Sequence, residues 1–212
     1  YQWQVSAGGG PFTNIAGATT ASLSLNNVNS SSNGNQYPCQ LSTAACSIPV
    51  NSAVVTLVVR QLPTVTLSAA PLTSLLPGQL STLTATASAP TGGIQSFVWF
   101  LNSNLVPGTG TTRQVNVEQI GSYRVRVQET FGSGVSCSSE SADVLIDAKV
   151  SNKLFIFPSP NDGRFTVSYY NNGGTNTQRR IIVIDAKGAR IYDRQFTITG
   201  PYTLLNIDMR NA

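Results

Sequence analysis

The sequence predicts an all-β protein made of several small β-sandwiches in a row. Short runs of alternating apolar and polar residues, rich in β-branched side chains, recur at intervals of roughly 8 to 12 residues between turn residues, and no stretch has helical periodicity. Such spacing is typical of sandwiches and leaves no room for crossover helices. In chain order the predicted strands are ASLSLNNV, AVVTLVVR, TVTLSAA, LSTLTATAS, SFVWFL, YRVRVQE, ADVLI, RFTVSYY, RRIIVID and RIYDRQFTI.

The composition favours an extracellular protein. Hydrophobic residues make up 41% of the 212 residues, as in ordinary globular domains, but charged residues make up only 10%. Serine, threonine, asparagine and glycine take their place. No apolar run is long enough to span a membrane. Because the chain opens on Tyr1 with neither a methionine nor a signal peptide, we expect it to begin inside a longer protein.

The net charge of +4 is unevenly distributed. Residues 1–148 carry four arginines and five acidic residues, whereas residues 149–212 carry nine basic residues and four aspartates. The basic residues of the second part alternate with acids around predicted hairpins, without interleaved aromatic residues. This pattern does not favour binding to nucleic acid.

Histidine is absent, which removes the usual general base of nucleophilic catalysis. The three cysteines, Cys39, Cys46 and Cys137, have no CxxC spacing, so we expect no metal and no cofactor. Asp143 and Asp147 share a strand face but lie about 13 Å apart, too far for a glycosidase pair. The sequence therefore predicts a protein that is not an enzyme.

One order of landmarks occurs twice. A tryptophan on one strand is followed by a tyrosine that lies two residues before an inward-facing position of a later strand. The first copy is Trp3, Tyr37 and Cys39, and the second is Trp99, Tyr123 and Val125. A core tryptophan and a tyrosine corner are marks of immunoglobulin-like sandwiches, so we expect both tryptophans to be buried between two sheets.

The stretch from YQWQVS to FTNIAGATTASLSLNNV resembles bacterial immunoglobulin-like domains of secreted Bacteroidetes proteins. The resemblance implies a first domain, residues 1–61, that starts at the third strand of the fold. It also implies that Cys39, at the sixth-strand position, pairs with a cysteine upstream of Tyr1 or with Cys46. A second, complete domain is expected at residues 62–148, with Ala85 and Val125 in the two cysteine positions, and Cys137 lacks a local partner.

The polar stretch AKVSN, residues 148–152, is interpreted as a linker to a third domain, residues 149–212. There KLFIFPSPNDGRFTVSYYNN is followed by RRIIVIDAKGARIYDRQFTI and LNIDMRNA. The prolines end a strand, and the Asp-Gly pair and the later glycine reverse the chain. Together these features resemble the type A C-terminal sorting domain of type IX secretion cargo. The matching positions are Pro158, Pro160, Asn161, Gly163, Phe165, Asp185 and Gly188.

The resemblance implies a small β-sandwich whose last strand follows Ala212. It also implies recognition by the type IX translocon and its outer-membrane shuttle protein, sometimes with removal by a sortase, and a secreted or outer-surface location. The expected function is a non-enzymatic stalk or adhesion region that contacts a surface glycan or protein. Two alternatives stay open. The domains could be accessory parts of a larger secreted hydrolase, or they could bind carbohydrate through Tyr169, Tyr170 and Tyr192.

Overall fold

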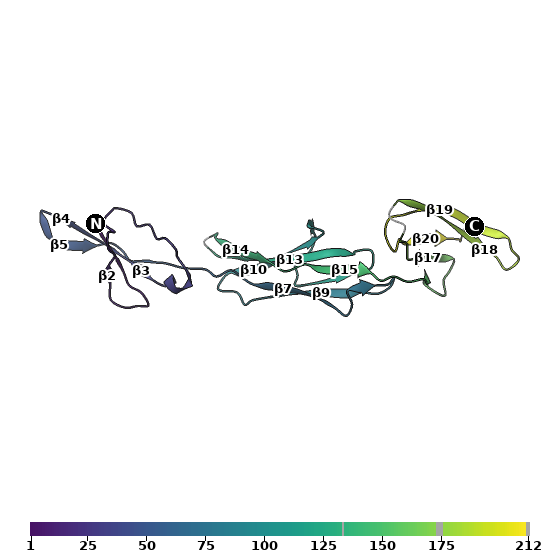
Figure 1. Cartoon of the computed structure of the whole chain (residues 1–212), viewed down its shortest axis with the longest axis horizontal. Helices are drawn as coiled ribbons and strands as arrows, with labels where there is room; N and C mark the ends of the chain where they lie inside the picture. Colours follow the sequence, from purple (N-terminus) through teal and green to yellow (C-terminus); the bar gives the residue numbers. More distant parts are fainter. Residues whose placement is uncertain (133, 173–175, 211–212) are drawn as a thin grey trace. The chain divides into compact units, whose positions relative to one another are not determined.

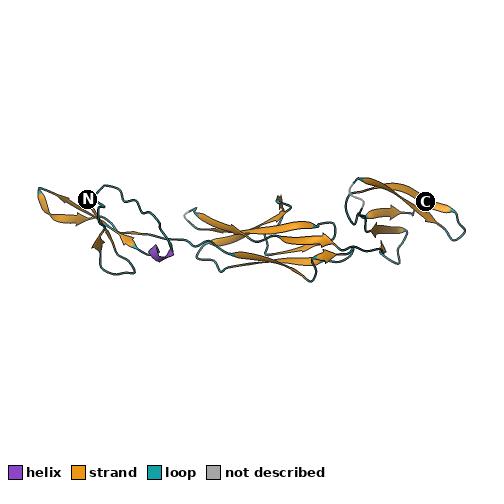
Figure 2. Cartoon of the chain, in the orientation of Figure 1, coloured by secondary structure: helices purple, strands orange, loops and turns teal. Residues whose placement is uncertain are grey.

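The protein is all-β, as predicted, in a computed structural model that describes residues 1–132, 134–172 and 176–210, without the side chains of Cys46 and Ser47 (Figures 1 and 2). The only helical turn in these ranges is a 3-10 helix, Ser30–Ser32. Contacts divide the chain into two compact units, residues 1–62 and 63–212. The proposed division of the second unit at residue 148 stays a prediction.

The first unit consists of a four-stranded sheet and a separate two-stranded ladder. One sheet has the order β2-β1-β4-β5, and a separate ladder joins β3 to β6. The strands are β1 (Gln2–Val5), β2 (Thr13–Asn14), β3 (Gln36–Tyr37), β4 (Cys39–Thr43), β5 (Cys46–Asn51) and β6 (Val55–Thr56). Trp3 pairs directly with Cys39, so both side chains lie on one face of the sheet.

Two expectations for this unit need correction. Residues 21–28 (ASLSLNNV) are not a strand, although they alternate as one does, because no described strand runs beside them to supply a ladder. Trp3 is half-buried instead of fully buried. It lines an apolar groove of about 320 Å³ together with Leu23, Leu25, Tyr37 and residues 55–58. The cause is the same in both cases, since none of the described sheets covers this face.

The second unit opens with a complete two-sheet sandwich. One sheet has the order β11-β10-β13-β15-β8, with β14 also paired to β13, and the other has the order β12-β9-β7. The strands are β7 (Val65–Ala70), β8 (Ser74–Leu75), β9 (Ser81–Ala87), β10 (Ile94–Leu101), β11 (Asn104–Val106), β12 (Thr112–Val115), β13 (Gly121–Thr130), β14 (Ser136–Glu140) and β15 (Val144–Ala148). The predicted strands of this region are confirmed, and β8 and β14 are additions.

The core of this sandwich contains the predicted landmarks. Trp99 is 1% exposed and donates from its indole Nε1 to Gly110 O at 2.9 Å. Tyr123 is fully buried, and its hydroxyl donates to Gln119 O at 2.6 Å, the bond that defines a tyrosine corner. Ala85 and Val125 lie in the same core cluster, so apolar packing occupies the place of an inter-sheet disulfide.

The rest of the second unit is a smaller pair of sheets around a separate core. A three-stranded sheet has the order β16-β17-β20, and β18 pairs with β19 in a hairpin. The strands are β16 (Leu154–Phe157), β17 (Arg164–Tyr169), β18 (Thr177–Ile184), β19 (Arg190–Ile198) and β20 (Leu205–Asp208). Val167, Ile198, Leu205 and Ile207 form the core. We call residues 153–210 the C-terminal module.

Candidate functional site

The proline-rich turn of the C-terminal module is held by its own side chains. The Asn161 carboxamide oxygen accepts from Gly163 N at 3.0 Å, and the Asp162 carboxylate accepts from Arg164 N at 3.2 Å. Gly163 has φ of +95°, which other residues rarely adopt, and its carbonyl accepts from Met209 N at 2.8 Å. The turn is therefore tied to the end of β20, 46 residues later in the chain by the numbering of Gly163 and Met209.

The second predicted turn, between β18 and β19, has the same design. The Asp185 carboxylate accepts from the backbone N–H groups of Lys187 at 2.9 Å and Ala189 at 2.8 Å. Gly188 has φ of +86° and donates to Asp185 O at 3.0 Å. Asp185 and Gly188 thus stabilise the turn in which they lie, and the Asp185 carboxylate makes its hydrogen bonds within that turn.

A cleft of about 370 Å³ opens beside the first turn. Its apolar part includes Phe165 and Ile207, which also pack on the core of the module. The full lining is Pro158, Arg164, Phe165, Thr166, Tyr192, Arg194, Asn206, Ile207 and Asp208. The structure therefore brings two of the predicted motif residues, Pro158 and Phe165, into one site. Asp185 and Gly188 do not line the cleft.

The rim of the cleft is charged. Asp208 pairs with Arg164 at 3.0 Å and with Arg210 at 2.9 Å. Arg194 lies over the ring of Phe196, 5.5 Å from its centroid, and is the second arginine in the lining. Asp208 thus pairs with two arginines, and Arg194 adds a third guanidinium group to the rim, which leaves this end of the module basic.

Other arginines of the module are held by an acid. Asp193 accepts from Arg180 at 2.6 Å and from Arg190 at 2.5 Å. The hydrogen bond from Arg180 is the main cause that lowers the pKa of the Asp193 carboxyl below its ordinary value. Asp193 thus pairs with two arginines, and the hairpin also carries Arg179 and Lys187 against Asp185, so the β18–β19 hairpin keeps a net positive charge as the rim of the cleft does.

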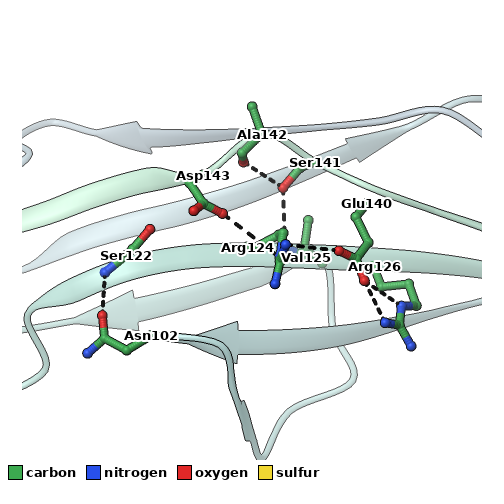
Figure 3. A network of polar contacts seen from close by, with 9 residues as sticks. All are labelled: Asn102, Ser122, Arg124, Val125, Arg126, Glu140, Ser141, Ala142 and Asp143. Atoms are coloured by element: carbon green, nitrogen blue, oxygen red, sulfur yellow. Dashed lines mark hydrogen bonds and ion pairs between the residues drawn. The ribbon is translucent and has the colours of Figure 1, made fainter.

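A second polar cluster, which the sequence analysis did not identify, covers the outer face of β13 (Figure 3). Glu140 pairs with Arg124 at 3.2 Å and with Arg126 at 2.5 Å, and both guanidinium groups stack over the ring of Phe100. Asp143 lies 3.9 Å from Arg124. The alternation in YRVRV was the available signal, since it places both arginines on one face. Two cations face two anions here, so the cluster has no excess charge to attract an ionic ligand.

Glu129 is a second group that was missed. It is fully buried, and its carboxylate accepts from Thr91 N at 2.6 Å, Thr91 Oγ1 at 3.1 Å and Gly93 N at 2.9 Å. Burial raises the pKa of the Glu129 carboxyl, but the hydrogen bonds from Gly93 and Thr91 together lower it below its ordinary value. A Cβ at Gly93 would lie 2.6 Å from Glu129 Cγ, so the loop packs directly on the carboxylate. The Glu129 carboxylate holds the loop at residues 91–93 in place, and we propose no catalytic or binding role for it.

The cysteines form no site in the structure. Cys39 is a buried free thiol, and Cys137 is a free thiol on β14. The strand register pairs Thr43 with Cys46, which places the backbone of Cys46 roughly 13 Å from that of Cys39, beyond the reach of a disulfide. The side chain of Cys46 lies outside the described residues. The pairing of Cys39 with a cysteine upstream of Tyr1 stays a prediction, which non-reducing peptide mapping would test.

The three tyrosines considered for carbohydrate binding do not form one platform. Tyr169 and Tyr192 pack on the core of the C-terminal module, whereas Tyr170 packs against the core of the preceding sandwich. Successive residues of a strand point to opposite faces, which separates Tyr169 from Tyr170. The rings of Tyr169 and Tyr170 are therefore used in packing, and Tyr192 packs on the core while it also lines the cleft.

Nowhere in the described ranges do three or more cysteine, aspartate or glutamate residues gather in a way that could hold a metal ion. No helix in the same ranges is long and apolar enough to cross a membrane.

Comparison with known proteins concerns the first unit. A family model described as a domain of unknown function (DUF8696) matches residues 1–61. The matched range ends one residue before the first compact unit, which ends at Leu62. No curated protein matches the chain. Because the description of the family names neither an activity nor a ligand, function has to be argued from the residues of the site.

Proposed function

We propose that the chain is a non-enzymatic stalk or adhesion region of a secreted or cell-surface protein, and that the C-terminal module is a sorting signal for type IX secretion. The observation that carries the proposal is the turn from Pro158 to Phe165. Pro158 and Phe165 line a cleft that also contains Arg164 and Arg194, and Gly163 is hydrogen-bonded to Met209 at the end of β20. The need to form a turn would explain each of these residue types, but it would not explain why the turn lies beside a cleft.

The cleft offers two means of recognition. Among the described strands, β20 pairs with β17 and has no partner on its other side, so its backbone can accept an added strand from a receptor. The arginines of the rim would favour an acidic receptor surface. Apolar side chains of the added strand would then contact Phe165 and Ile207. The partners we propose are the translocon and its outer-membrane shuttle protein, with a sortase acting on the exported protein.

The stalk assignment is supported by what the sandwiches contain. The polar cluster on β13 is balanced in charge, and the buried carboxylate of Glu129 binds a loop of its own domain. Neither arrangement offers a nucleophile beside a base, which favours a spacer or adhesive role over an accessory catalytic one. The tyrosine packing described above disfavours a carbohydrate platform.

The test uses a fluorescent reporter joined to the chain in a bacterium that has type IX secretion. We expect the reporter to reach the outer surface with the whole chain and to stay in the periplasm when everything from Lys153 onward is removed. Removal of residues 1–62 is the control, and it should leave export intact. Equal surface delivery with and without the C-terminal module would contradict the proposal.

A point variant separates recognition from folding. Arg194→Glu reverses one charge at the cleft and should reduce surface delivery while the melting temperature of the protein stays unchanged. Lys187→Glu makes the same change in the same module, at a turn that does not line the cleft, and should have no effect. If both variants were exported as well as the wild type, the cleft would not be the recognition surface.

A further inference from the structure

The loop between β19 and β20 joins two different cores. Ile198 and Leu205, at the two ends of the loop, are each 1% exposed and belong to the core of the C-terminal module. Tyr202, between them, is 3% exposed but belongs to the core cluster of the preceding sandwich. One short segment is therefore buried in both halves of the second unit.

Hydrogen bonds within the C-terminal module hold the loop in its conformation. The Thr203 hydroxyl accepts from Thr199 N at 2.9 Å and from Gly200 N at 3.1 Å, which closes the loop on itself. Pro201 O accepts from Asn171 N at 2.9 Å, which ties it to the segment after β17. These bonds lie within the module, so they hold Tyr202 in position without help from the sandwich.

Tyr202 has both a polar and an aromatic partner. Its hydroxyl donates to Lys149 O at 2.7 Å, and Lys149 N in turn donates to Leu75 O at 2.8 Å. The ring meets Phe155 and Tyr170 edge-on, with centroid distances of 5.8 and 5.5 Å. Both of those rings are partly buried against the core cluster that contains Tyr202. The predicted linker is therefore hydrogen-bonded on both sides of Lys149, where a flexible linker would be solvated.

We propose that Tyr202 docks the C-terminal module onto the preceding sandwich, so that residues 63–212 unfold as one cooperative unit. The recognition surface is the end of the sandwich formed by the core around Leu75 and the backbone of Lys149, and its partner is the 199–204 loop of the same chain. This inference goes beyond the proposed export function and does not depend on it. It revises the expectation that residues 148–152 join two independent domains.

Trypsin cleavage after Lys149 measures the docking directly. The side chain of Lys149 is exposed, but its backbone is held by the two bonds above, and cleavage requires that backbone to be released. In the full chain we expect Tyr202→Ala to accelerate cleavage at this bond at least about tenfold and Tyr202→Phe, which keeps the ring, to accelerate it less. Tyr1→Ala, at a tyrosine that is 55% exposed, is the matched control and should not change the rate.

Calorimetry and NMR test whether the sandwich and the C-terminal module unfold together. The second unit of the wild type should melt in one transition, and Tyr202→Ala should split it into two. The methyl resonance of Ile207 reports whether the C-terminal module itself stays folded in the variant. Two transitions in the wild type, or a Tyr202→Ala variant with unchanged cleavage and melting, would overturn the proposal.

Discussion

At the scale of single residues, several polar side chains of this chain fix turns and loops. Asn161, Asp162 and Asp185 each accept backbone N–H bonds at a hairpin, and Glu129 does the same for the loop at 91–93. A protein with only 10% charged residues uses its carboxylates in this way because turns in β-structure leave many backbone donors without ladder partners. The residues that resemble a sorting motif belong to this group.

Glu129 leads to a prediction about acid stability. Because the pKa of its carboxyl is lowered in the folded protein, its contribution to stability is present in full above the unfolded value of about 4.3 and is lost as the pH falls through the lower folded value. Glu129→Gln should therefore lower the melting temperature of the second unit at pH 7 and remove part of its decline below pH 4.3.

Thermal melts at a series of pH values check this prediction. Glu118→Gln, at an exposed glutamate of the same sandwich, is the control and should follow the wild type throughout. A Glu129→Gln variant that keeps the wild-type melting temperature at neutral pH would show that the three hydrogen bonds to Thr91 and Gly93 contribute no stability.

At the scale of strands, the two segments that share the tryptophan and tyrosine landmarks use the same local bonds. Trp3 donates to Thr20 O and Trp99 to Gly110 O, while the hydroxyls of Ser52 and Ser141 accept from the backbone N–H groups of Cys39 and Val125. The repeats differ in what covers them. Strands β7 and β9 cover the face around Trp99, and no described strand takes their place over Trp3.

Intrinsic fluorescence should report this difference. In Trp3→Phe the remaining Trp99 is buried, so emission should be at short wavelength and acrylamide quenching weak. In Trp99→Phe the remaining Trp3 lines an open groove, so emission should shift to longer wavelength and quenching should be severalfold stronger. Each variant needs a cooperative melt as its folding control. Equal quenching of the two variants would mean that the groove over Trp3 is closed in solution.

Sequence patterns predicted where strands form better than they predicted which segments lie next to those strands. Alternation located β7, β9, β10, β13 and β15, and the tyrosine corner at Tyr123 followed from its spacing to Val125. The same alternation failed at residues 21–28, because a strand also needs a neighbour to bond with. Glu129 could have been found, since it continues the inward series of Tyr123, Val125 and Val127. The cleft and the contacts of Tyr202 depend on pairings between distant segments, and local patterns do not encode these.

At the scale of the whole molecule, cores are distributed unevenly along the chain. The largest cluster includes Leu75, Leu83 and Ile146, all at most 1% exposed, and extends to Tyr202. Its buried members all belong to the second unit. In the first unit the buried hydrophobic residues are Tyr37 and Cys39, as far as the structure describes it. Small, open sandwiches bury little surface, so the two units should differ in stability.

A core substitution tests whether the units are independent in folding. Leu83 is fully buried, and Leu83→Ala removes buried side-chain volume at an expected cost of about 2–5 kcal/mol in the free energy of unfolding. In calorimetry of the full chain this should lower the melting transition of residues 63–212, by roughly 4–20 °C at 2–4 °C per kcal/mol, and leave the transition of residues 1–62 in place. Leu62→Ala, at a leucine that is 68% exposed between the units, is the matched control and should move neither transition. If Leu83→Ala lowered both transitions together, the chain would fold as one unit instead of two. The half-covered face around Trp3 would then have to be stabilised by the rest of the chain.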